Sequence, residues 1–185
     1  MKCLLCKNIN LEKTDIDDNL TARKCPDCGG IWIQAKAYWK WIKYHGNIHP
    51  EKSAAEPALS AGTDSVQIKI CPDCGHFLTK RKVGHGIAFH IDRCQCCGGI
   101  WLDKNEWEIL KSRNLHDEIH FIFSREWQEE IINEEKKAAY EREVEKIIGI
   151  EDYKYLKSFA DKYRHFPRRD VILAYLQHHL AETEE

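Results

Sequence analysis

Eight of the nine cysteines in this chain of 185 residues stand in four Cys-x2-Cys pairs, a spacing that is typical of zinc ligands. The pairs are Cys3 and Cys6, Cys25 and Cys28, Cys71 and Cys74, and Cys94 and Cys97. In each half of the chain, 18 or 19 residues separate one pair from the next. Two such pairs supply the four thiolates of one tetrahedral Zn²⁺, and four thiolates leave no open coordination position. The sequence therefore predicts two structural Zn²⁺ ions per chain.

Two other uses of these cysteines remain as alternatives, namely an iron centre and a redox-active pair. A redox pair is normally single and lies in a thioredoxin-like βαβ context, which the sequence lacks. Cys96, the ninth cysteine, stands inside the last pair. It is interpreted as a thiol beside the zinc, with an alternative zinc ligand and an oxidation-sensitive switch as the other hypotheses.

The zinc-binding unit is repeated in tandem. The run Gly-Gly-Ile-Trp occupies 29–32 and again 98–101, a shift of 69 residues. In the second copy, Asp103 and Glu106 have the spacing of a capping box, which predicts a helix with Trp107 on its buried face. The first copy has Gln and Ala at the equivalent positions, 34 and 37, so its helix lacks this start signal.

Aromatic residues are dense in the predicted helix of the first copy. Tyr38 and Trp41 fall where Trp107 and Leu110 stand in the second copy. They are expected to supply the core of a small ribbon. The alternative is a stacking platform for unpaired bases.

The predicted fold class is α+β: two small four-cysteine zinc ribbons, each with short antiparallel strands and a helix, followed by an α-helical C-terminal region. The predicted domains are ribbon 1 with its aromatic-rich helix at 1–45, a flexible linker at 46–65, ribbon 2 with its capped helix at 66–115, and a helical region at 116–185. The helical region is expected to contain one long helix, 116–148, and two shorter helices at 152–163 and 168–181.

Charge and hydropathy exclude some classes of function. The formal net charge is −2, which argues against bulk electrostatic binding to nucleic acid as the whole function. Residues 66–116 carry eight basic and five acidic side chains, whereas 117–150 carry five basic and ten acidic ones. No apolar run approaches the roughly 20 residues of a membrane span. Paired metal-binding cysteines, with no signal-peptide core before Cys3, predict a cytoplasmic protein without membrane association.

The second copy resembles the TFIIB-type zinc ribbon (transcription factor zinc-finger) family. The resemblance rests on Cys-x2-Cys-Gly-Gly-Ile-Trp-Leu-Asp-x2-Glu at 94–106, preceded by Cys-Pro-x-Cys-Gly at 71–75. The first copy shares the four cysteines and Gly-Gly-Ile-Trp, but it lacks the first proline and the Asp and Glu of the cap. The resemblance implies a zinc-binding ribbon similar to that of a general transcription factor, where such ribbons dock on polymerase or nucleic acid.

The expected function is that of a non-enzymatic structural-zinc protein, a protein-interaction or docking module that acts through its tandem ribbons and a helical assembly region. The expected partner is a protein, and one form of assembly is a homo-oligomer through the helix at 116–148. The first alternative is a nucleic-acid-binding, transcription-associated protein, for which the basic run Lys80-Arg81-Lys82 is a candidate contact. The second alternative, a thiol-based redox sensor, rests on Cys96 alone. No catalytic triad, phosphate-binding glycine loop or acid/base pair of carboxylates is evident, so no enzyme is expected.

Overall fold

The structure, a computed structural model, describes residues 1–45 and 65–181. It contains two compact units, Met1–Ile132 and Asn133–Glu185. Of the linker predicted at 46–65, all but Ser65 lies outside the described residues. The first unit contains both ribbons, so its boundary falls later than the start of the helical region that the sequence predicted at 116.

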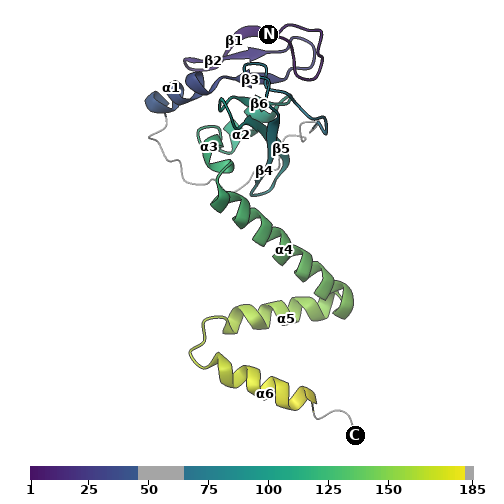
Figure 1. Ribbon diagram of the computed structural model, residues 1–185. Helices are drawn as coiled ribbons and strands as arrows, with labels where there is room; N and C mark the ends of the chain where they lie inside the picture. Colours follow the sequence, from purple (N-terminus) through teal and green to yellow (C-terminus); the bar gives the residue numbers. More distant parts are fainter. Residues whose placement is uncertain (46–64, 182–185) are drawn as a thin grey trace. The chain divides into compact units, whose positions relative to one another are not determined.

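One six-stranded antiparallel sheet joins the two ribbons in the order β1-β2-β3-β6-β5-β4 (Figure 1). Its strands are β1 (Glu12–Asp17), β2 (Leu20–Lys24), β3 (Ile31–Ile33), β4 (Leu78–Gly84), β5 (Ile87–Cys94) and β6 (Ile100–Leu102). The central pair is β3 with β6, in which Trp32 lies opposite Trp101. The two Ile-Trp segments of the duplication therefore pair with each other and join the ribbons.

The sequence Gly84-His85-Gly86 predicts a hairpin turn, and this turn is present between β4 and β5. Its two loop residues, His85 and Gly86, have φ values of 49° and 82°. Two positive φ values in succession are the signature of a type I′ turn, whose twist matches that of the flanking strands. The turn pairs Gly84 with Ile87, and an irregularity between Lys82 and Gly84 then shifts the register of β4 on β5, so that Leu78 lies opposite Cys94 at the far end.

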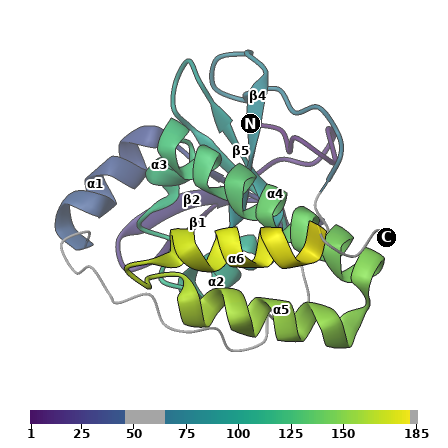
Figure 2. The same ribbon diagram turned by 90° about the horizontal axis from the view of Figure 1, so that it is seen from below.

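Three helices cover the core of the first unit: α1 (Ala35–His45), α2 (Glu106–Ser112) and α3 (Ile119–Ile122). Tyr38 and Trp41 of α1 are buried in one cluster with Trp107 and Leu110 of α2. The expectation that these aromatic rings supply the core is confirmed, and a stacking platform made of Tyr38 and Trp41 is excluded. α3 lies beside α1 (Figure 1 and Figure 2), and the Tyr38 hydroxyl donates to the carbonyl oxygen of Asp117 at 2.9 Å.

The helical region consists of α4 (Arg125–Ile148), α5 (Ile150–Tyr163) and α6 (Arg169–Ala181). The prediction of one helix over 116–148 is wrong at its beginning, because the chain forms the separate helix α3 and starts again at Arg125. Ser124 marks the break, since its hydroxyl oxygen accepts a hydrogen bond from the backbone N–H of Trp127 at 3.2 Å. The Trp127 indole then donates to the carbonyl oxygen of Val83 at 2.8 Å and fixes the start of α4 against β4. Within the part of the chain that the structure describes, no helix is both long and apolar enough to span a membrane.

Candidate metal centres

The four cysteine pairs meet in two clusters, as the spacing predicted. One cluster contains Cys3, Cys6, Cys25 and Cys28, and the other contains Cys71, Cys74, Cys94 and Cys97. Their Sγ–Sγ separations include 3.6 and 3.9 Å in the first cluster and 3.4 Å twice in the second. A tetrahedral zinc with Zn–S bonds of about 2.3 Å places its sulfurs about 3.8 Å apart. A disulfide would need about 2.05 Å. The geometry therefore fits zinc, and all nine cysteines are free.

Each cluster is built on two tight turns. In the turn after β5, the N–H of Gly98 donates to the carbonyl oxygen of Cys94 at 2.9 Å. Gly98 has a φ of 73°, and Gly29 has 74° at the same place in the first copy. This backbone conformation is strained for other residues, which explains the first glycine of each Gly-Gly pair.

The electrostatics of the thiols favour a bound cation. Burial raises the pKa of Cys6 and of Cys71, and burial likewise raises the pKa of Cys28 to about 11. In contrast, a hydrogen bond from the backbone N–H of His76 lowers the pKa of Cys74 to about 6. Four thiolates within one cluster repel one another unless a metal ion compensates their charge.

The sequence model of the transcription factor zinc-finger family, the TFIIB-type zinc ribbon, matches residues 2–44 and 70–113. The chain contains two TFIIB-type zinc ribbons. The resemblance is thus confirmed for both copies, including the first, which lacks the cap. Two four-cysteine sites in two such ribbons hold two structural Zn²⁺ ions per chain. No curated protein and no solved structure matches the chain significantly.

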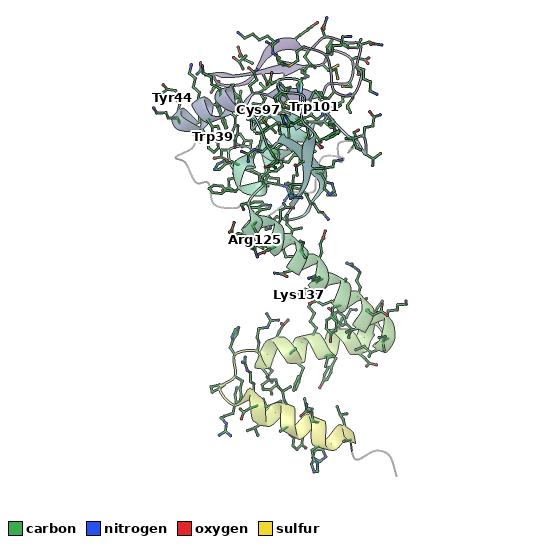
Figure 3. The ribbon with its side chains drawn as sticks, in the orientation of Figure 1. Trp39, Tyr44, Cys97, Trp101, Arg125 and Lys137 are labelled. Atoms are coloured by element: carbon green, nitrogen blue, oxygen red, sulfur yellow. The ribbon has the colours of Figure 1, made fainter. Side chains whose placement is uncertain are left out.

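The second glycine of each Gly-Gly pair lies under a tryptophan of the other ribbon. A Cβ at Gly99 would lie 2.2 Å from the Trp32 ring, and a Cβ at Gly30 would lie 2.2 Å from the Trp101 ring. Real Cβ atoms do not approach a ring so closely, so both positions require glycine. The repeated Gly-Gly-Ile-Trp run therefore builds a reciprocal interface between the ribbons. Figure 3 shows Trp101 close to Cys97 in the ribbon unit.

The polar contacts of the two tryptophans are not symmetric. The Trp32 indole crosses to ribbon 2 and donates to Asp73 at 3.0 Å, and Gln34 donates to the same carboxylate at 3.1 Å. The position equivalent to Asp73 in ribbon 1 is Leu5, which offers no acceptor. The Trp101 indole instead donates to Asp103 of its own ribbon at 2.6 Å.

A buried ion-pair network supports ribbon 2, and sequence reasoning missed it. The Lys69 ammonium lies 2.6 Å from the Asp92 carboxylate and 3.5 Å from that of Asp103. The lysine side chain is fully buried, and the two carboxylates are 6% and 4% exposed. The alternation of Ile68, Lys69 and Ile70 gives no hint of this, because Ile68 and Ile70 are exposed while the lysine points inward.

The network also changes the predicted capping box. Glu106 accepts a hydrogen bond from the N–H of Asp103 at 2.7 Å, as a capping box requires. The other hydrogen bond of a capping box, from a backbone N–H of the helix to the Asp103 carboxylate, is replaced. That carboxylate accepts hydrogen bonds from the Trp101 indole, the Lys69 ammonium and the backbone N–H of Ser65. α2 consequently begins later, at Glu106, after Asn105 in a left-handed conformation with φ 69°. Half of the capping box is thus confirmed.

Cys96 lies on the surface of ribbon 2, outside the four-cysteine cluster. Its thiol is exposed and free. Its ligand atom and those of Cys74 and His76 lie within 4.8 Å of one another. His76 was not singled out from the sequence, although an imidazole two residues after a zinc cysteine was a signal available there.

Proposed function

We propose that this protein is a non-enzymatic docking protein, in which the zinc-held ribbon unit carries a helical segment that binds another protein chain. One observation carries the proposal. Among the described residues of the second unit, 133–181, none is buried. A folded helical region normally buries an apolar face against a neighbour, so this region is expected to complete its packing with a partner.

The apolar side chains that would make this interface are concentrated on the last two helices. On α5, Tyr155 and Leu156 are 78% and 50% exposed. On α6, the exposed apolar side chains are Val171, Leu173, Tyr175 and Leu180. Isolated helices of 14 and 13 residues are marginal in water. Burial of these side chains at an interface supplies the missing stabilisation at roughly 25 cal/mol for each Å² of apolar surface.

A second copy of the chain is the partner we favour. Residues 133–181 contain ten basic and nine acidic side chains, so two copies of this segment do not repel each other through net charge. Self-association through one shared apolar surface is the commonest form of protein assembly. The sequence also led us to expect a homo-oligomer, but through the helix at 116–148, whereas this proposal places the interface on α5 and α6.

Native mass measured by light scattering over a range of protein concentrations tests this proposal on the full, zinc-loaded chain. We expect a dimer or higher oligomer that dissociates on dilution, and we expect Leu173→Glu to shift it to the monomer. The matched control is Ala139→Glu, which adds the same charge at an exposed position of α4, outside the interface proposed on α5 and α6. A wild-type monomer at the highest soluble concentration, with slow hydrogen exchange throughout α5 and α6, would overturn the proposal, because helices that are stable alone need no partner. A monomer with fast exchange would reject a second copy and leave another protein as the partner.

Nucleic-acid binding is the second candidate, and the exposed face of α1 favours it. Lys36, Trp39, Lys40, Lys43 and Tyr44 are all exposed, and their spacing places them on one side of the helix. Trp39 and Tyr44 are 46% and 72% exposed, and Figure 3 shows both on α1. Cations that reach phosphates beside rings that stack on bases are the components of a single-strand binding surface.

Fluorescence anisotropy with a labelled single-stranded oligonucleotide tests this candidate. Binding should weaken steeply with salt. The Trp39→Ala and Lys40→Ala variants should bind more weakly than wild type, whereas Tyr155→Ala, which removes an exposed ring from α5, should not. Absence of binding at low salt would reject a nucleic-acid role and leave protein docking.

A further inference from the structure

Ribbon 2 carries a second group of metal-binding side chains on its outer surface. The ligand atoms of Cys74, His76 and Cys96 lie within 4.8 Å of one another, and the side chains of His76 and Cys96 are exposed. We propose that this group binds an additional Zn²⁺, which shares the Cys74 thiolate with the structural zinc. The proposal does not depend on the docking function.

The donor set has the chemistry of a zinc site with an open position. Two thiolates and one imidazole are three protein ligands, and a fourth position remains for water or another exchangeable ligand. A thiolate sulfur that binds one zinc retains lone pairs for a second, so Cys74 can bridge two ions. A site with one open position at the surface is expected to bind zinc more weakly than the closed four-cysteine sites.

The imidazole is oriented by the backbone. His76 Nδ1 lies 3.1 Å from the carbonyl oxygen of Cys74. A ring N–H that donates to a backbone carbonyl fixes the tautomer and leaves the lone pair on the other ring nitrogen, the arrangement that is common for zinc-bound histidines. The contact holds the ring beside the Cys74 sulfur.

Ribbon 1 provides an internal comparison. Asp27 stands in the position of Cys96, and its carboxylate lies 3.2 Å from the Cys6 sulfur. The bridges Lys2–Asn10 and Ile70–Phe77 align the two first turns, so that Ile9 corresponds to His76. Among its described residues, ribbon 1 contains no second group of metal-binding side chains. The thiol and the imidazole are therefore found together only in ribbon 2. Ribbon 1 forms the equivalent turn without either side chain, so the turn itself does not require them.

A metal titration of the full chain tests the proposal. The protein is loaded with its two structural zinc ions, dialysed against metal-free buffer, and titrated with Zn²⁺ in competition with a chromophoric chelator. We expect a third equivalent whose affinity falls at least about tenfold in both Cys96→Ser and His76→Asn. Co²⁺ as a probe should give a thiolate-to-cobalt absorption band for this equivalent in wild type, and Cys96→Ser should weaken that band.

The controls separate this site from the structural ones. Both substituted side chains are exposed, so each variant should retain two zinc ions per chain and the native unfolding transition. His165→Asn, the same change at an exposed position between α5 and α6, should leave the third equivalent unchanged. The proposal is overturned if wild type binds no third equivalent or if both variants still bind it. It is also overturned if either variant loses a structural zinc, because its side chain would then belong to the four-cysteine site.

Discussion

Replacing Lys69 by methionine should destabilise the ribbon unit strongly. The change removes an ammonium group that lies 2.6 Å from Asp92 and 3.5 Å from Asp103, both nearly inaccessible to water. Methionine is unbranched and flexible, so it fills most of the same space. Removing one partner of a buried ion pair costs about 3–5 kcal/mol, because the remaining charge is left uncompensated.

The Lys69→Met variant can remove the uncompensated charge by protonating one of the two buried carboxylates. The free energy of this protonation is an upper limit to the loss of stability, and it depends on pH. Burial raises the pKa of Asp92 from its ordinary value of 3.8, and loss of Lys69 should raise it further. Protonating one such group costs about 4.4 kcal/mol at pH 7 and about 2.3 kcal/mol at pH 5.5, at about 1.36 kcal/mol for each pH unit. The folded variant then holds a proton that its unfolded chain releases, so its stability falls as the pH rises. The deficit of the variant should therefore be smaller at the lower pH.

Guanidinium unfolding of the zinc-loaded chain at the two pH values measures this deficit. All six tryptophans precede residue 133, so their fluorescence reports the ribbon unit. The matched control is Lys111→Met, which breaks an ion pair of 2.8 Å with Asp17 in which the lysine side chain is 47% exposed. Its cost should stay below about 1 kcal/mol. If Lys69→Met costs no more than the control, or if its deficit is the same at both pH values, the electrostatic account of the network is wrong.

Three further predictions concern the ribbon interface, the zinc centres and the start of α4. Gly30→Ala and Gly99→Ala should each lower the free energy of unfolding by about 1–3 kcal/mol, because the added methyl group overpacks the interface. The double variant should lose less than the sum of the two, because either methyl already separates the ribbons. Additive losses in denaturant unfolding would contradict a shared interface. Cys25→Ser should reduce the metal content to one zinc per chain. It should also accelerate the chelator-driven loss of the remaining zinc, because both ribbons share one sheet. An unchanged rate of zinc loss would mean that the ribbons are independent. Ser124→Ala should cost about 1 kcal/mol in denaturant unfolding, and no loss would show that Ser124 is not a helix cap.

The features predicted correctly from the sequence depend on short-range chemistry. The spacing within each cysteine pair fixes two ligands on one turn, and the repetition of the pattern identifies the two pairs that share an ion. The hairpin at Gly84–Gly86 was predicted because few residues adopt positive φ values in succession. The burial of Tyr38 and Trp41 followed from their alignment with the helix of the second copy.

The features that the sequence did not reveal depend on long-range pairing. Each ribbon ends in a short Ile-Trp strand with a free edge, and local patterns do not specify which edge pairs with which. The buried Lys69 was missed because its own neighbours in sequence are apolar and exposed, and its two partners lie 23 and 34 residues away. The break before α4 is different, since Ser124 is a good capping residue and was a local signal.

The interface between the ribbons has the reciprocity of a symmetric dimer, in which the same surface patch is used twice. Each tryptophan lies on the second glycine of the other ribbon, and the paired strands run antiparallel about Trp32 and Trp101. The hydrogen bonds to these rings break that symmetry, because only ribbon 2 has an acidic residue, Asp73, in its first turn to accept the indole of the other copy.

The broken symmetry explains why the two copies differ at the start of their helices. Gln34 and Asp103 occupy equivalent positions, but Gln34 donates to Asp73 across the interface, whereas Asp103 accepts the Trp101 indole within its own ribbon. Each tryptophan N–H at this crowded interface needs a hydrogen-bond acceptor. This one requirement therefore explains both the missing cap of ribbon 1 and the buried network of ribbon 2. Substitution at either position should consequently affect the contact between the ribbons more than the helix that follows it.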